Sequence, residues 1–301
     1  MDPFAPGVLP SLPPSLHEAG VQAIGTNSSQ VRVLANRAPL LRIEGDPVPR
    51  AEGFYDRMDG VGAHEVVLED AGDRALEDQA LSEIEVVIEA WKLRMLDLMR
   101  DPRLRSFFVL KSVGREAGAL VTHSLSQVIA MAVVPPALRN RLQVAREFYA
   151  RKKRSIFADL LAEEVRVGTR LVYENNGFTV YCPYASRAPF QMAILPKRQC
   201  PDFHGLTDQE RAQFADVLRA ALRKLRAALD RPPYQLALIT APTRTRRADR
   251  WHTIEADFRW QVEIVPQLFP TFPMEWATGC AVNAIWPEVA ASHLRNLDPS
   301  A

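Results

Sequence analysis

The strongest pattern along the chain is a helical one that occurs twice. In two segments the apolar side chains lie three or four positions apart, which is the spacing of one face of an α-helix. They are Ile84, Val87, Ile88, Trp91, Met95, Leu98 and Met99 in one segment, and Phe214, Val217, Leu218, Ala221, Leu222, Leu225 and Leu229 in the other. Each segment opens with a hydroxyl residue followed three positions later by glutamate, Ser82 with Glu85 and Thr207 with Glu210. This is the pattern of a capping box, so the sequence predicts two amphipathic helices with matching starts.

Short β-type runs surround both predicted helices in the same order. Two runs precede each helix and two follow it: 31–34, 66–69, 107–111 and 128–134 in one copy, and 178–181, 192–195, 235–240 and 260–265 in the other. The hexapeptide Ala35-Asn36-Arg37-Ala38-Pro39-Leu40 also reappears as Ala185-Ser186-Arg187-Ala188-Pro189-Phe190. Matching elements and turns at two places indicate an internal duplication. We therefore expect an α+β fold with two repeats, in which helices flank an antiparallel sheet.

The duplication sets the expected organisation of the chain. We expect a proline-rich N-terminal arm at 1–30, a first repeat at 31–137, a linking helix at 138–165 and a second repeat at 166–301. The arm lacks the basic and apolar regions of a signal peptide. The apolar run 128–134 stops at Pro135 and is too short to span a bilayer.

Charge and cysteine usage narrow the classes of partner. Lysine plus arginine number 37 and aspartate plus glutamate 36, so no net field attracts nucleic acid or an anionic membrane. The three cysteines, Cys182, Cys200 and Cys280, are far apart and form no Cys-x-x-Cys motif. This usage is typical of a reduced, cytoplasmic protein, and Cys182 is expected to be a buried strand residue. We expect neither a nucleic acid nor a membrane as a partner.

The segment 118–131 joins a glycine-containing turn to a strand that carries a histidine, an arrangement that can present N–H groups and an imidazole to a phosphate. Its residues Gly118-Ala119-Leu120-Val121-Thr122-His123-Ser124-Leu125-Ser126-Gln127 resemble Gly-Ala-Ser-x-x-His-Pro-His-Ser/Gly-Gln, the active-site motif of the galactose-1-phosphate uridylyltransferase family in the histidine-triad superfamily. Residues 62–69, 115–119, 189–197 and 274–279 resemble further motifs of this family. The resemblance covers nearly the whole chain and implies tandem histidine-triad-like repeats and a homodimer.

One position of the active-site motif departs from the family. The second histidine of the motif is the nucleophile that takes up the nucleotidyl group, and Leu125 stands in its place. A leucine side chain cannot attack phosphorus. The resemblance therefore indicates the ancestry of the chain, whereas the covalent nucleotidyl–histidine reaction is not expected of it.

The resemblance also implies bound metal, but most of the ligands are missing. A zinc site needs three or four Cys, His or carboxylate ligands. The positions that the family's ligands would occupy, apart from His123, are 18–30 and Asp73 in the first repeat, and Ser155-Ile156-Phe157-Ala158, Gln199 and Arg259-Trp260-Gln261 in the second. Only His123 keeps a ligand of the family type, so we expect no metal and no other cofactor.

His123 is the candidate catalytic residue. A histidine can act as an acid, a base or a phosphate donor near neutral pH, and the alternative is a hydrogen-bonded histidine without a chemical role. The resemblance places a phosphate contact at Gln127, a nucleoside contact at Asn36 and a contact to sugar hydroxyls at Glu275, which is otherwise a locally paired carboxylate. His64, in the motif at 62–69, is a second-tier candidate.

Arginines supply the remaining substrate-binding candidates. Arg37 lies beside Asn36 and is a candidate phosphate partner, although the matching Arg187 is also consistent with a repeated structural role. Arg244 and Arg247 belong to a loop rich in arginine, and arginine side chains suit phosphate or carboxylate binding. A charged loop can equally be a solvated one.

Three hypotheses for the function remain. The first is a divergent protein of this family that binds a nucleotide, a sugar phosphate or another small anionic ligand, without covalent catalysis and with a different reaction open to it. The second is a pseudoenzyme or scaffold that binds a protein partner. The third is a nucleotidyltransferase that uses a displaced nucleophile.

Overall fold

The computed structural model describes residues 31–70, 72, 74–244 and 251–298. Its strands and α-helices are, in chain order, β1 (Arg32–Ala35), β2 (Arg50–Glu52), β3 (Tyr55–Arg57), β4 (Gly62–Leu68), α1 (Leu81–Leu98), β5 (Ser106–Val113), β6 (Leu125–Met131), α2 (Pro136–Lys152), α3 (Ile156–Val167), β7 (Leu171–Glu174), β8 (Phe178–Tyr181), β9 (Met192–Pro196), α4 (Asp208–Leu229), β10 (Tyr234–Ile239), α5 (Ile254–Asp257), β11 (Gln261–Pro266), α6 (Pro273–Thr278) and α7 (Pro287–Asn296). The described helices include none with the length and apolar character needed to cross a membrane.

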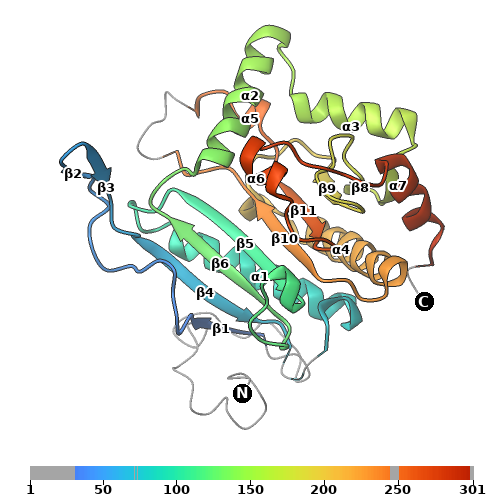
Figure 1. Ribbon diagram of the computed structural model, residues 1–301, viewed down its shortest axis with the longest axis horizontal. Helices are drawn as coiled ribbons and strands as arrows, with labels where there is room; N and C mark the ends of the chain where they lie inside the picture. Colours follow the sequence, from blue (N-terminus) through green and yellow to red (C-terminus); the bar gives the residue numbers. More distant parts are fainter. Residues whose placement is uncertain (1–30, 71, 73, 245–250, 299–301) are drawn as a thin grey trace.

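Nine of these strands form one antiparallel sheet in the order β1-β4-β6-β5-β10-β11-β9-β8-β7. The hairpin β2–β3 is separate and projects away from the body of the molecule (Figure 1). The order β1-β4-β6-β5 is followed by the reverse order of the equivalent strands, β10-β11-β9-β8. The predicted α+β fold with tandem repeats, an antiparallel sheet and flanking helices is therefore confirmed.

The register of the sheet shows which residues of the two repeats are equivalent. In the first repeat Gln127 of β6 lies opposite Val66 of β4 and Leu110 of β5. In the second repeat Glu263 of β11 lies opposite Ala193 of β9 and Ala237 of β10. Leu110 and Ala237 are themselves partners in the pairing of β5 with β10. An approximate two-fold axis therefore passes through this central pair, and Glu263 occupies the place that Gln127 has in the first repeat.

Alternate residues of β6 face opposite sides of the sheet. Ser126, Val128 and Ala130 are fully buried, and the indole of Trp91 on α1 donates to Ser126 Oγ at 2.7 Å. This side of the sheet, together with α1 and α4, encloses the main hydrophobic core. Gln127 faces the other side, where the candidate site lies.

The starts of the two long helices differ from each other. Thr207 caps α4 as predicted: its Oγ1 accepts from Glu210 N at 3.2 Å, and the Glu210 carboxylate accepts from Thr207 N at 3.0 Å. The predicted pairing of Ser82 with Glu85 is wrong. The helix is capped two residues earlier, at Ala80, so that α1 begins at Leu81, and Glu83 accepts from Ala80 N at 2.8 Å. Ser82 therefore lies within the first turn, where its side chain is exposed.

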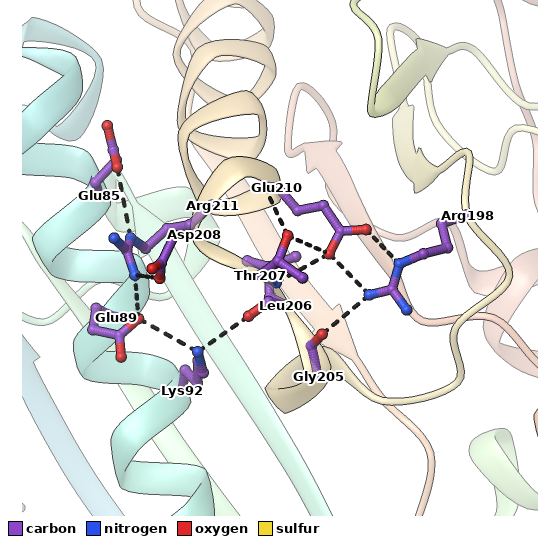
Figure 2. Close-up of polar contacts among 10 residues, drawn as sticks. All are labelled: Glu85, Glu89, Lys92, Arg198, Gly205, Leu206, Thr207, Asp208, Glu210 and Arg211. Atoms are coloured by element: carbon purple, nitrogen blue, oxygen red, sulfur yellow. Dashed lines mark hydrogen bonds and ion pairs between the residues drawn. The ribbon is translucent and has the colours of Figure 1, made fainter.

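Charged contacts join the first turns of α4 to α1. Figure 2 shows Arg211 of α4 directed toward Glu85 and Glu89 of α1, with 2.9 Å between Arg211 Nη1 and Glu89 Oε2. Lys92 of α1 donates to the carbonyl of Leu206 at 3.1 Å. The two repeats are thus connected on the helical side as well as through the sheet.

A single linking helix was expected at 138–165, but two helices, α2 and α3, occupy this region. The break lies at Lys153, whose backbone is left-handed, with φ at 57°. Lys153 belongs to the charged run 151–154, which has no apolar side chain that could continue the buried stripe of α2. The boundaries proposed for the arm, the repeats and the linker stay predictions.

Candidate functional site

A cavity of ≈ 460 Å³ opens on the side of the sheet opposite α1. It is lined by the loop after β1, by β4 and β6, and by the glycine-containing loop before β6. Four of the predicted site residues, Asn36, Arg37, His123 and Gln127, line this cavity together with His64. The structure therefore brings these five residues into one place.

His64 is the centre of a hydrogen-bonded group in this cavity. Leu40 N donates to His64 Nδ1 at 3.1 Å, so the ring proton is on Nε2. Nε2 then donates to Gln127 Oε1 at 2.5 Å. The amide nitrogen of Asn36 lies 3.0 Å from the same Nε2, and the amide oxygen of Asn36 accepts from Ala38 N at 2.9 Å. The amide groups of Asn36 and Gln127 are therefore gathered around His64 Nε2 on the wall of the cavity.

His123 is held against the loop that follows β4. Its side chain is buried, and Nε2 lies 3.0 Å from the carbonyl oxygen of Asp70. A carbonyl only accepts, so His123 Nε2 is a donor here. The Asp70 carboxylate in turn accepts from Gly72 N at 2.9 Å and from Arg74 Nη2 at 2.6 Å. Burial alone would raise the pKa of Asp70, but the hydrogen bonds from Arg74 and Gly72 outweigh it and hold the pKa below its ordinary value.

Leu125 contributes an apolar wall to the cavity. Its half-buried side chain packs against Leu34, Val66 and Leu68 on the same side of the sheet. Hydrocarbon therefore occupies the place where the family resemblance implies the nucleophilic imidazole.

A buried ionic cluster that no sequence motif predicted lies beneath the glycine-containing loop. Lys111 Nζ lies 2.6 Å from Glu69 Oε2 and 3.2 Å from both Ser124 Oγ and the Leu125 carbonyl oxygen. Ser124 Oγ also donates to Glu69 Oε2 at 2.7 Å. Lys111 and Glu69 are almost inaccessible to solvent, so this cluster fixes the backbone on either side of Leu125. The available signal was Lys111 itself, which follows Phe107 and Val109 on the buried side of β5.

The predicted substrate-binding residue Glu275 does not line the first-repeat cavity. Glu275 lines a different cavity of ≈ 520 Å³ in the second repeat, together with Arg187 and Glu263. Its carboxylate accepts from Val282 N at 2.8 Å and Phe272 N at 2.9 Å, and these hydrogen bonds lower its pKa. Glu275 therefore closes the first turn of α6 and is not part of the first-repeat cavity.

The arginine-rich loop is only partly described. Arg244 pairs with Asp202 at 2.8 Å and with Glu255 at 2.7 Å, so these carboxylates hold its guanidinium. Arg247 lies outside the described residues. Burial raises the pKa of the Cys182 thiol to about 12, in keeping with a strand-end residue of the core.

No family model matches the chain, whereas individual proteins do. The ADP-glucose phosphorylase of Arabidopsis thaliana is 27% identical over 275 residues, which are 89% of this chain and 74% of that protein. The galactose-1-phosphate uridylyltransferase of Thermotoga maritima is 26% identical over 266 residues, which are 87% of this chain and 83% of that protein.

Solved structures are similar over nearly the full length. The crystal structure of an Arabidopsis thaliana ADP-glucose phosphorylase with bound ADP-glucose has a TM-score of 0.84 at 26% identity, and the match covers 98% of this chain and 90% of that one. A uridylyltransferase mutant has a TM-score of 0.82 at 25% identity, covering 97% and 92%. Sequence and structure thus agree on the same set of proteins.

Proposed function

Because this chain belongs to the galactose-1-phosphate uridylyltransferase family of the histidine-triad superfamily, we propose that its first-repeat cavity binds a nucleotide sugar or sugar phosphate without a covalent nucleotidyl–histidine intermediate. The observation that carries this proposal is Leu125. It packs against Leu34, Val66 and Leu68, at the place where the family's reaction needs an imidazole.

The hypothesis of a displaced nucleophile is less well supported. His64 and His123 are the imidazoles that line the cavity within the described residues. Both ring nitrogens of His64 are engaged, by Leu40 N and by Gln127 Oε1. His123 Nε2 donates to the Asp70 carbonyl. A nucleophilic nitrogen needs a lone pair directed at phosphorus. Both nitrogens of His64 and Nε2 of His123 are directed toward protein groups, so His123 Nδ1 is the position at which the labelling experiment below tests this hypothesis.

The polar groups of the cavity suit phosphate oxygens. Gln127 and Asn36 present amide N–H groups beside His64, and Arg37 is an exposed guanidinium on the same rim. Amide donors and a guanidinium bind anionic oxygens without a metal. The solved ADP-glucose phosphorylase binds ADP-glucose on the same fold, which supports the nucleotide-sugar class as the ligand here.

A calorimetric titration with ADP-glucose, UDP-glucose and glucose 1-phosphate tests the binding role of Gln127. We expect Gln127→Ala to weaken the tightest of these ligands by about tenfold or more, because a hydrogen bond to a charged oxygen is lost. Gln143→Ala is the matched control, since Gln143 lies exposed on α2 and bonds to Glu147. Equal affinities of the wild type and Gln127→Ala would contradict the proposed site.

A labelling experiment tests the absence of covalent catalysis. We expect no acid-labile nucleotidyl adduct when the wild type is incubated with labelled ADP-glucose or UDP-glucose. The variant Leu125→His, which returns an imidazole to the family position, is the comparison that shows whether the fold still admits the adduct. An adduct on His123 or His64 of the wild type would refute the proposal and favour the displaced-nucleophile hypothesis.

We also propose a homodimer, as the family resemblance implies. Leu40 and Leu120 line the cavity and are 77% and 98% exposed, which is unusual for two large apolar side chains at one rim. A second copy that covers this rim would remove both from water. Light scattering should give twice the chain mass, and Leu120→Lys should shift the measured mass toward that of the monomer. A monomeric wild type would refute the homodimer.

The alternative hypothesis, a scaffold that binds another protein, makes a different prediction. In that case His123→Ala and Gln127→Ala would leave the function in the cell unchanged.

A further inference from the structure

In the second repeat, the positions at which the family resemblance implies metal ligands lie together. The segment Ser155–Ala158 opens α3, Gln199 follows β9 and Arg259 precedes β11. Ser155 Oγ donates to the carbonyl of Asp257 at 3.1 Å, and Gln199 Nε2 donates to the carbonyl of Phe258 at 2.5 Å. Three segments that are far apart in the sequence therefore meet immediately before β11, as they would around a shared ion.

The side chains at this meeting point do not fit a metal ion. They are a hydroxyl, a methyl, an amide and a guanidinium, whereas zinc is held by thiolates, imidazoles or carboxylates. A guanidinium has no acceptor and cannot be a ligand. Throughout the described ranges, no three His, Cys, Asp or Glu side chains are grouped as a metal would require. The metal centre implied for this repeat therefore disagrees with the donor set of this chain.

The Arg259 guanidinium is hydrogen-bonded to the segment that follows β9. Its side chain is buried, with the residue 3% exposed. Nε and Nη2 donate to Gln199 Oε1 at 3.2 and 3.1 Å, and Nη1 donates to the carbonyl of Pro196 at 2.8 Å. No described carboxylate forms an ion pair with it, and burial lowers its pKa. A cationic group bound by neutral oxygens is costly to bury, so its presence calls for a structural reason.

We infer that the contact between Arg259 and Gln199 is a metal-free link that fastens the segment after β9 to the start of β11, in the place of a metal centre. The link supplies a fixed positive group with several donors, as an ion would supply a positive centre with several bonds. It goes beyond the proposed ligand site, because it lies in the other repeat and touches no part of the first-repeat cavity.

The first repeat supports this inference independently. The sheet register makes Glu263 the equivalent of Gln127, and Arg259 and His123 each lie four residues before these positions. His123 donates to the Asp70 carbonyl in the segment after β4, as Arg259 donates to the Pro196 carbonyl at the end of β9. Both repeats therefore use a basic side chain at the same place to hold the same connection.

Thermal unfolding in the presence and absence of EDTA tests the link. We expect the wild-type Tm to be unchanged by the chelator, and elemental analysis to find no stoichiometric transition metal. Arg259→Met should lower the Tm by about 5 °C or more. Gln199→Met should lower it too, and the double variant should be no worse than the more damaging single one, because the two side chains act as a pair.

Arg198 provides the matched control. It is the neighbour of Gln199 in the sequence, and its guanidinium contacts Glu210 and the carbonyl of Gly205 (Figure 2). Its side chain is 48% exposed, so Arg198→Met should change the Tm by no more than about 2 °C. If Arg259→Met does not fold, Arg259→Lys takes its place. Lysine keeps the positive charge but lacks the planar guanidinium with its several N–H donors, so this variant should fold with a Tm below that of the wild type.

A variant that restores the family's ligand types gives a readout of a different kind. Ser155→Cys, Ala158→Cys, Gln199→His and Arg259→His combined should bind about one zinc per chain and become sensitive to EDTA. A folded quadruple variant that binds no zinc would overturn the inference. The inference would also be wrong if the wild type carried one metal ion per chain, or if the Arg259→Met variant were as stable as the Arg198→Met variant.

Discussion

Individual side chains decide what this site can do, and the register of the strands decides which of them meet. His64 bonds to Leu40 through Nδ1 and to Gln127 through Nε2, and the Asn36 amide nitrogen lies 3.0 Å from the same Nε2. Leu125, at the position that the family resemblance gives to the nucleophile, forms none of these contacts. Under the proposed function, ligand binding therefore does not depend on the side chain at position 125.

Asp70 gives a prediction for pH dependence. Its folded-state pKa lies below the ordinary value of 3.8, because hydrogen bonds from Arg74 and Gly72 outweigh the effect of burial. The ionised carboxylate therefore stabilises the fold above about pH 4, and this contribution is lost as the pH falls through the folded-state pKa. Asp70→Asn should lower the Tm at pH 7, and its difference from the wild type should shrink below about pH 4. A difference that stays constant with pH would show that the charge of Asp70 does not matter.

Four predicted site residues that meet in the structure come from motifs with a fixed spacing. Asn36, His64, His123 and Gln127 were found in this way and line one cavity. The cluster of Lys111, Glu69 and Ser124 was not, because its members lie on three segments and only the folded sheet brings them within 3.2 Å. Glu275 belonged to a motif as well, but its spacing says nothing about which cavity it faces.

At the scale of an element, the N-termini of α1 and α4 show which helix starts a local sequence pattern can predict. The predicted cap at Thr207 is confirmed, whereas the one at Ser82 is wrong by two residues, because Ala80 is the N-cap of α1. The sequence around Ser82 offers two glutamates. The structure uses Glu83, which also pairs with Arg74 at 2.9 Å, and Glu85 lies toward Arg211 of α4 (Figure 2). The choice is made by tertiary partners that a local pattern does not contain.

The two helix starts give a paired prediction. Thr207→Ala should destabilise the protein by about 1 kcal/mol, because Glu210 N loses its acceptor. Ser82→Ala should change the free energy of unfolding by less than about 0.5 kcal/mol, because Ser82 is exposed within the first turn. Urea denaturation of both variants measures the difference. Equal losses in the two would mean that Ser82 caps α1 after all.

At the scale of the whole molecule, the two repeats share one sheet. The central strands β5 and β10 pair over six residues, and the charged contacts between α1 and α4 join the repeats on the helical side. The duplication in the sequence predicted two similar units. It did not predict which strands would pair at the centre, because the register there depends on side chains from both units.

This continuity predicts a single unfolding transition. Hydrogen exchange of amides in β4 and in β9 should report the same unfolding midpoint, because neither repeat can lose its strands without exposing the edge of the other. Ala237→Pro at the central pair should lower this shared midpoint, since it removes an amide hydrogen from an interior strand. Two separate midpoints in the wild type would show that the repeats unfold independently.

The pairing of Leu110 with Ala237 also bears on how such a chain can arise. A polypeptide with only one repeat would leave the full length of its inner strand open, and an open strand edge recruits another of its kind. Two copies would close around a symmetry axis at this pair, with self-complementary surfaces. In this chain α2 and α3 join the two repeats, and the equivalent positions hold different residues, Gln127 in one repeat and Glu263 in the other.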